Sequence, residues 1–211
     1  MVSYNIRIMD YITLAPREII EKTMSALKSN GIDVEFVSNR EEAKQRVLKL
    51  IPEQAEVFTT TSVTTDTIGL SEELNNSGKY NSVRNKLNAM DRTAQNSEMQ
   101  KLGAAPDWVV GSIHAVTQDG QVFIASRSGS QIPPYAYGAS HVIWVVGVQK
   151  IVENSDAAFK RIYEHSLKLE SERVKQAYGM ESSSVDKVLI INKESAPNRI
   201  RLIFVNELLG Y

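Results

Sequence analysis

The sequence predicts a three-layer α/β/α protein, built on a mostly parallel sheet with an antiparallel hairpin embedded in it. Three observations lead to this prediction. Strand-like and helical patterns alternate over residues 16–59, as they do in parallel sheets. Residues 108–151 contain three apolar runs rich in Val and Ile, and the turn signal Asp119-Gly120 separates the first two. A long amphipathic pattern then follows over residues 155–178.

The first part of the chain has the order helix, strand, helix, strand. Ser38 and Glu41 have the spacing of a capping box. In this motif the Ser38 side chain accepts a hydrogen bond from a backbone N–H of the first helical turn, and the Glu41 side chain reaches back to the backbone N–H of Ser38. A strand–helix–strand order predicts a right-handed crossover and therefore parallel strands. The predicted elements are a helix over residues 16–27, a strand over 32–37, a helix over 38–51 and a strand over 56–59.

A run of hydroxyl side chains, residues 59–65, begins where the last of these strands ends, and a helical pattern follows it. A turn between a parallel strand and a helix is a favourable place for a phosphate or carboxylate. The candidate ligand-binding residues here are Thr61, Ser62 and Thr64. The competing interpretation is that one hydroxyl only caps the helix, and the sequence favours this cap over a ligand site.

Residues 75–90 are polar, weakly periodic and locally basic. This composition is typical of a solvated surface loop or a loosely attached short helix, and a lid over an anionic ligand is the sharper alternative. A helix is predicted over residues 91–101, before the apolar runs of the central segment.

The second and third apolar runs are joined by a loop rich in Ser and Gly, which ends in Pro133-Pro134. Successive small residues form a nest of backbone N–H donors suited to an anion, although a glycine-rich turn before two prolines would have the same composition. Gly111 and Ser112, in the first run, would let a ligand approach the backbone. The candidate ligand-binding residues are Gly111, Ser112, Ser126, Gly129, Ser130, Gln131 and Tyr135.

Two residues of the central segment are candidates for acid–base catalysis, His114 and Asp119. A half-buried histidine that binds a backbone group is the competing interpretation for His114. The sequence lacks cysteine, and its three histidines have no HxH or HxxxH spacing, so we expect neither a metal site nor another cofactor.

The rest of the chain predicts one long helix over residues 155–178 and two strands over 185–192 and 200–206. The last four residues, 208–211, are apolar. They are expected either to dock on the protein's own core or to form a homo-oligomer interface.

Length and composition favour one domain over residues 1–211, with residues 1–14 as an N-terminal extension and residues 75–90 as a lid or loop insertion. The 24 basic and 25 acidic residues nearly cancel, which argues against a nucleic-acid partner. No apolar run approaches the roughly 20 residues of a membrane helix, and the N-terminus lacks the apolar core of a signal peptide. We therefore expect a cytoplasmic protein that does not bind membranes.

The central segment and the C-terminal part resemble the lactate-utilisation (LUD) domain family over roughly residues 15–211. Several separated motifs carry the resemblance in the family's order. They are Asp107–Thr117, Asp119-Gly120, Ser130-Gln131, Tyr135–Ala139, His141–Gly147, Gln149–Val152, Ile190–Lys193 and Val205–Glu207.

The resemblance implies the fold of glucosamine-phosphate deaminase, ribose-phosphate isomerase and the coenzyme A transferases, with a ligand crevice at the carboxyl ends of the strands. It implies a subunit or accessory role in lactate or organic-acid utilisation, with a small anionic ligand and with partner proteins that carry iron–sulfur clusters. Two alternatives stay open. One is an enzyme acting on a phosphorylated small molecule or a coenzyme A- or folate-like ligand, and the other is a non-catalytic protein that assembles an iron–sulfur oxidoreductase complex.

One departure concerns the coenzyme A transferases, which use a glutamate nucleophile near the crevice. No glutamate lies between Met99 and Ile151, so the comparison does not support covalent acyl transfer by this chain.

Overall fold

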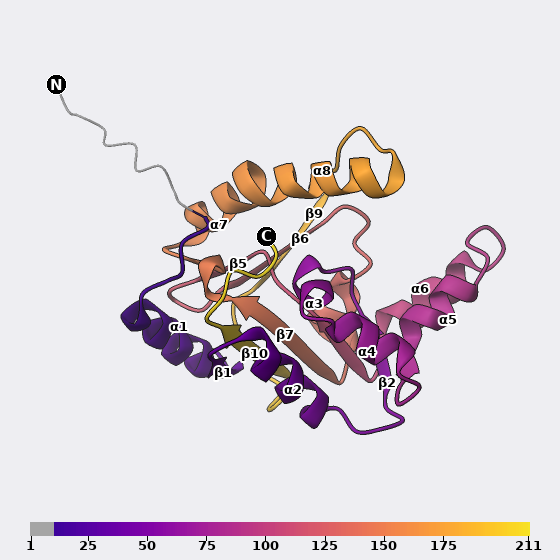
Figure 1. The fold of residues 1–211 in the computed structure, drawn as a ribbon, viewed down its shortest axis with the longest axis horizontal. Helices are drawn as coiled ribbons and strands as arrows, with labels where there is room; N and C mark the ends of the chain where they lie inside the picture. Colours follow the sequence, from indigo (N-terminus) through magenta and orange to yellow (C-terminus); the bar gives the residue numbers. More distant parts are fainter. Residues whose placement is uncertain (1–10) are drawn as a thin grey trace.

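The computed structural model describes residues 11–211, and within them helices surround two sheets (Figure 1). All neighbouring strands of the larger sheet are parallel, which confirms the predicted fold class. In order across the sheet, its strands are β1 (Asp33–Val37), β10 (Ile200–Val205), β7 (His141–Gly147), β4 (Trp108–Gly111), β2 (Glu56–Thr59) and β3 (Asn81–Ser82).

The central strand β7 is buried on both faces, which makes the sheet the middle layer of the fold. Val142 and Trp144 pack in the cluster that contains the apolar residues of α1 (Arg17–Ser29). Ile143, on the opposite face, packs with α2 (Arg40–Leu50) and α4 (Leu70–Asn76). Apolar side chains on both faces are typical of parallel strands covered by helices.

The antiparallel hairpin lies in a second sheet, at one side of the main sheet. Gly120 has a φ of +84° in its turn, as the Asp-Gly signal predicted. The first apolar run is not one strand: it ends in the main sheet at Gly111 and resumes in the second sheet at Ala115. This sheet contains β8 (Ile151–Val152), β5 (Ala115–Thr117), β6 (Val122–Ser126) and β9 (Lys187–Ile191), in that order.

The capping residue of α2 differs from the prediction by one position. The side chain of Asn39, and not that of Ser38, accepts from the backbone N–H of Glu42 at 2.9 Å. The Glu42 carboxylate reaches back to the Ser38 N–H at 2.9 Å. Asn caps a helix as well as Ser does, so the reciprocal pair forms one residue later.

The predicted helix over residues 155–178 is continuous but contains a π-helical turn. It consists of α7 (Ser155–Arg161), the π turn η3 (Ile162–Ser166) and α8 (Leu167–Tyr178). π turns inside helices frequently occur at functional sites. This one places Ser166 in the lining of the cavity described below and Arg161 behind the cavity wall.

Residues 75–90 belong to the edge of the main sheet. They include β3 and α5 (Val83–Ala89), which lies beside α6 (Asn96–Ala104) (Figure 1). Arg84 donates to the carbonyl of Thr59 from Nε at 3.0 Å and from Nη2 at 2.6 Å. The segment therefore holds the end of β2, and its role as a lid stays a prediction.

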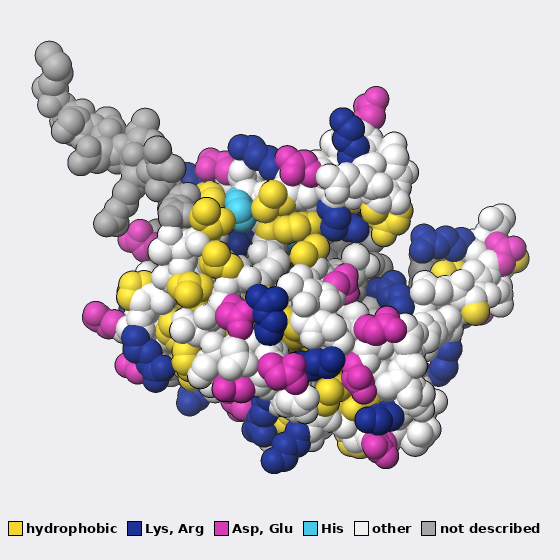
Figure 2. Space-filling view, in the orientation of Figure 1, with side chains coloured by type: hydrophobic (Ala, Val, Ile, Leu, Met, Phe, Trp, Pro, Cys, Tyr) yellow, Lys and Arg dark blue, Asp and Glu magenta, His cyan; other side chains and the backbone are white. Residues whose placement is uncertain are grey.

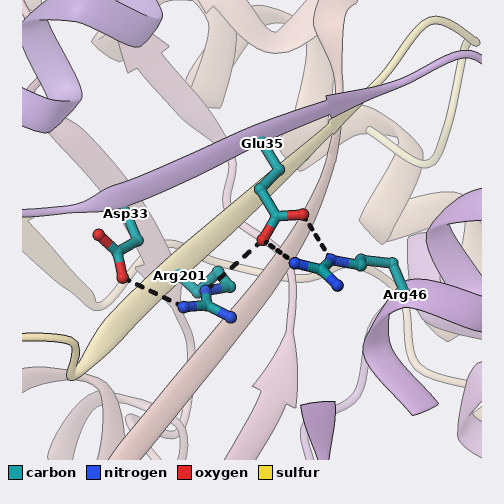
Figure 3. A network of polar contacts seen from close by, with 4 residues as sticks. All are labelled: Asp33, Glu35, Arg46 and Arg201. Carbon is teal, nitrogen blue, oxygen red and sulfur yellow. Dashed lines mark hydrogen bonds and ion pairs between the residues drawn. The ribbon is translucent and has the colours of Figure 1, made fainter. Parts of the chain in front are cut away.

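A network of partly exposed charges joins β1, β10 and α2 (Figure 3). Arg201 lies 3.3 Å from Asp33 and 3.8 Å from Glu35, and Glu35 also pairs with Arg46 at 2.5 Å. Over the face shown in Figure 2, charges of both signs are interspersed. Exposed pairs of this kind contribute at most about 1 kcal/mol each.

The C-terminal residues dock on the protein's own core, one of the two predicted outcomes. Leu209 is fully buried, and its carbonyl accepts from Gln149 at 2.9 Å and from Thr64 at 3.3 Å. A homo-oligomer stays a prediction. No helix among residues 11–211 combines the length and apolarity needed to cross a membrane. Most of the predicted N-terminal extension, residues 1–10, lies outside the described part.

Candidate functional site

A cavity of about 540 Å³ lies where the hydroxyl-rich turn after β2 meets the Ser/Gly loop after β6, with α8 as a further wall. The structure thus brings the two predicted loops together, although they are more than 60 residues apart in the sequence. The cavity lies at the carboxyl ends of parallel strands, where α/β proteins usually bind ligands. The predicted residues that line it are Thr61, Ser62, Thr64, Ser112, His114, Ser126, Ser130 and Gln131.

Four predicted residues do not line the cavity. Gly111 and Tyr135 lie behind it: the buried Tyr135 hydroxyl is 3.0 Å from Thr60 Oγ1, and a Cβ at Gly111 would lie 2.1 Å from both oxygens. Gly129 has a φ of +87° and forms the turn of its loop. Asp119 is exposed in the hairpin turn, at the opposite end of β6 from the cavity, and accepts from the Thr117 hydroxyl. The structure therefore gives Asp119 no place in a shared site with His114.

The predicted nest of free N–H donors is partly occupied by the loop's own hydroxyls. The Gly129 N–H donates to Ser126 Oγ at 2.9 Å, and the Ser130 N–H donates to Ser128 Oγ at 3.3 Å. Gln131 donates to the Ala125 carbonyl at 3.2 Å. The Ser126 hydroxyl in turn donates to Gln131 Oε1 at 3.1 Å, so these contacts stabilise the turn itself.

Lys150 is the most unusual side chain of the cavity, and the sequence analysis gave it no role. It follows β7 in the short 3₁₀ turn η2 (Val148–Lys150) and is 1 % exposed. Its Nζ donates to the Ile113 carbonyl at 3.0 Å, to Thr64 Oγ1 at 3.1 Å and to Ser112 Oγ at 3.2 Å. Burial, reinforced by the charge of Arg161, lowers the pKa of Lys150 well below its ordinary value.

A second buried cation, Arg161, lies directly behind the cavity wall. Its Nη1 donates to the His114 carbonyl at 2.5 Å and to Ser166 Oγ at 3.1 Å, whereas its Nε and Nη2 have no hydrogen-bond partner among the described residues. Burial lowers the pKa of Arg161 to about 10, so it is charged at neutral pH. Within residues 11–211, no carboxylate lies within 4.0 Å of either Lys150 or Arg161.

His114 is neutral at physiological pH. Its Nδ1 accepts from the Ala125 N–H at 3.1 Å, which places the ring proton on Nε2. Burial, together with the nearby charges of Lys150 and Arg161, lowers the pKa of His114 to about 3. A base this weak takes up no proton at pH 7, so His114 serves better as a hydrogen-bond donor than as the general base of the initial prediction.

Two acidic residues, Asp66 and Glu170, line the cavity. Glu170 of α8 accepts from Arg173 at 2.7 and 2.8 Å and from the Tyr211 hydroxyl at 2.6 Å. Burial disfavours its charge, but these hydrogen bonds outweigh the cost and its pKa is lowered. Glu170 is thus ionised and already paired. No group of three or more His, Asp or Glu side chains in the described chain could hold a metal ion.

The sequence profile of the LUD domain matches residues 20–205, nearly the whole chain. The chain belongs to the LUD domain family. A solved DUF162 family protein from Deinococcus radiodurans is similar in fold, with a TM-score of 0.57 at 12 % identity over 92 % of this chain and 100 % of that one. Ribose 5-phosphate isomerase A from Neisseria gonorrhoeae has a TM-score of 0.34 at 13 % identity, over 55 % of this chain and 54 % of the isomerase. No curated protein matches the sequence.

The LUD-family motifs contained one signal for the unpredicted cation. Gln149-Lys150 is among the residues that carry the family resemblance, and Lys150 is a single charge between apolar residues on both sides. The side chain of a lysine in such a run either is buried in the core or extends into solvent. The sequence alone does not decide between these outcomes, because the fold of the preceding turn sets the direction of the side chain.

Proposed function

We propose that this LUD-domain protein binds a small carboxylate or phosphate ligand in the cavity, next to Lys150. The observation that carries the proposal is the pair of buried basic side chains, Lys150 and Arg161, which have no carboxylate partner in the described chain. Burying a cation is costly unless an opposite charge accompanies it. An anion in the cavity would supply that charge, and Thr61 and Ser62 would offer it hydroxyl donors.

The metabolic role that fits best is a subunit or accessory factor in the use of lactate or a related organic acid. Two observations support this part of the proposal: the family to which the chain belongs, and the absence of cysteine. A chain without cysteine supplies no thiolate for an iron–sulfur cluster, so such clusters would lie in partner proteins.

An enzyme acting on a phosphorylated small molecule is the second candidate, and His114 favours it. A neutral imidazole with its proton on Nε2 is a donor suited to a phosphoryl or carbonyl oxygen in the cavity. In this case His114→Asn, which keeps an acceptor for the Ala125 N–H, would abolish turnover and leave the fold intact.

Anions are expected to stabilise the protein thermally, and Lys150→Met is expected to remove this effect. The test uses the full chain with lactate, other organic acids, inorganic phosphate, sugar phosphates and coenzyme A derivatives, with chloride at equal ionic strength as reference. At about 100 times its Kd, a ligand adds roughly 2.7 kcal/mol to the unfolding free energy. For a chain of this size that raises the Tm by roughly 5–10 °C.

The matched control is Lys160→Met, which removes an exposed lysine of α7 that does not line the cavity. It should respond to anions as the unaltered protein does. The affinity for a carboxylate should also rise as the pH is lowered, because burial lowers the pKa of Lys150 and the anion favours its protonated form. No response to any anion, or an equal response in Lys150→Met, would contradict the proposal.

A further inference from the structure

The wall that α8 gives to the cavity runs along most of that helix. Leu167, Glu170, Val174 and Tyr178 all line the cavity, and their spacing of three and four residues places them on one helix face. From Leu167 to Tyr178 the helix rises about 16 Å. The cavity is therefore elongated, and α8 follows its length.

The two buried basic side chains lie at one end of this wall. Ser166, immediately before α8, accepts from Arg161, which also donates to the His114 carbonyl. The adjacent carbonyl, that of Ile113, accepts from Lys150, so Lys150 and Arg161 both lie near the beginning of α8. At the other end of the helix, the cavity is lined by Tyr178, Met180 and Arg127, and Arg127 Nη1 donates to Met180 Sδ at 3.3 Å.

Apolar side chains line part of the stretch between these ends, beside Arg173, Ser183 and Ser184. Val174 is 5 % exposed, and Val185 reaches the cavity from the loop that follows α8. That loop is held against the helix by the Ser183 N–H, which donates to Ser171 Oγ at 3.0 Å. The one carboxylate of this helix face, Glu170, is already bound by Arg173 and Tyr211.

The cavity is also larger than a three-carbon acid needs. Such an acid has six non-hydrogen atoms, and at the roughly 30 Å³ that one water takes in the liquid it would occupy about a third of the 540 Å³. Pockets of this size usually hold larger molecules.

We propose that the natural ligand is elongated: its carboxylate or phosphate lies at the Lys150 end, and an apolar segment of several carbons or a ring lies along Val174 toward Tyr178. This inference rests on the proposed function and specifies the class of ligand. Small acids such as lactate would occupy only the polar end and bind more weakly.

Straight-chain monocarboxylates test the proposal, because acetate, butanoate, hexanoate and octanoate share one charge and differ in length. Calorimetric titration of the full chain, below micelle-forming concentrations, should show an affinity that rises about fourfold for each buried methylene. Lys150→Met should bind none of them. Tyr178→Ala should lower the ratio of octanoate to acetate affinity, whereas Tyr163→Ala, an exposed tyrosine outside the cavity, should leave both affinities as they are.

Each outcome separates the two proposals. Equal binding of acetate and octanoate would overturn the elongated ligand and leave the anion site. If Lys150→Met still bound longer carboxylates more tightly than shorter ones, the chains would be binding outside the cavity, and the proposal of an elongated ligand would be overturned. Absence of binding by every carboxylate and by inorganic phosphate would overturn the proposed function and the present inference with it.

Discussion

Between pH 7 and pH 4, the unfolding free energy of the protein is expected to fall by about 3 kcal/mol more than that of a His114→Asn variant. The cause is the difference between the ordinary pKa of histidine, 6.5, and the pKa of about 3 that His114 has in the folded protein. At a pH between these two pKa values, His114 binds a proton in the unfolded chain but not in the folded protein. Acidification therefore favours unfolding, and the whole difference, about 5 kcal/mol, is reached only below pH 3.

Urea denaturation at several pH values between 7.5 and 4 would measure this effect. Asn is the appropriate replacement because its side-chain oxygen can accept from the Ala125 N–H, as Nδ1 of His114 does, and because it does not titrate. Above pH 7 the two stability curves should be parallel. Parallel curves down to pH 4 would show instead that His114 takes up a proton in the folded state, and would remove the argument for a neutral imidazole at the cavity.

The same comparison bears on the site, because Lys150 and Arg161 contribute to the low pKa of His114. A bound anion would offset their charges and raise that pKa. A saturating carboxylate should therefore reduce the acid-dependent loss of stability, and this reduction should be absent in Lys150→Met.

Sequence patterns predicted the fold well where one local signal decides the structure. Asp119-Gly120 forms the hairpin turn, and β1, β2 and β10 lie within a residue or two of their predicted bounds. The split of the first apolar run between two sheets was not predictable in this way. A run of Val and Ile indicates burial in a sheet, but only tertiary packing decides in which sheet each half lies.

The candidate site was predicted in part for a related reason. Ser and Thr at strand ends indicated both loops, but only the first follows a strand of the parallel sheet, where the carboxyl ends of the strands meet at one edge. Lys150 and Glu170 line the cavity, and Arg161 lies behind its wall, in turns and helices whose sequence gave no such signal. Arg161 and Glu170 belong to a helix with charges of both signs, a pattern typical of a solvated face, and only the π turn and the packing of α8 give them these positions.

Tyr135 connects the site to another buried charge, Arg199, which holds the turn η1 (Pro134–Gly138) in place. Arg199 donates to the carbonyls of Ala139, Pro134 and Tyr135 at 2.9, 3.0 and 3.1 Å. It also pairs with Glu194 at 2.6 Å, and both side chains are largely buried. This turn places the Tyr135 hydroxyl against Thr60, behind the cavity.

Arg199→Met is therefore expected to lower the unfolding free energy by about 4 kcal/mol, because it leaves a largely buried carboxylate and three carbonyls without their donor. Arg201→Met, in the adjoining strand β10, is the matched control: its partners, Asp33 and Glu35, are partly exposed, and it should cost at most about 1 kcal/mol (Figure 3). Adding Glu194→Gln to Arg199→Met should recover part of the loss, since the unpaired charge is then removed. Similar losses for the two arginine variants in chemical denaturation would show that the three carbonyls find other donors, and that the turn holding Tyr135 does not depend on Arg199.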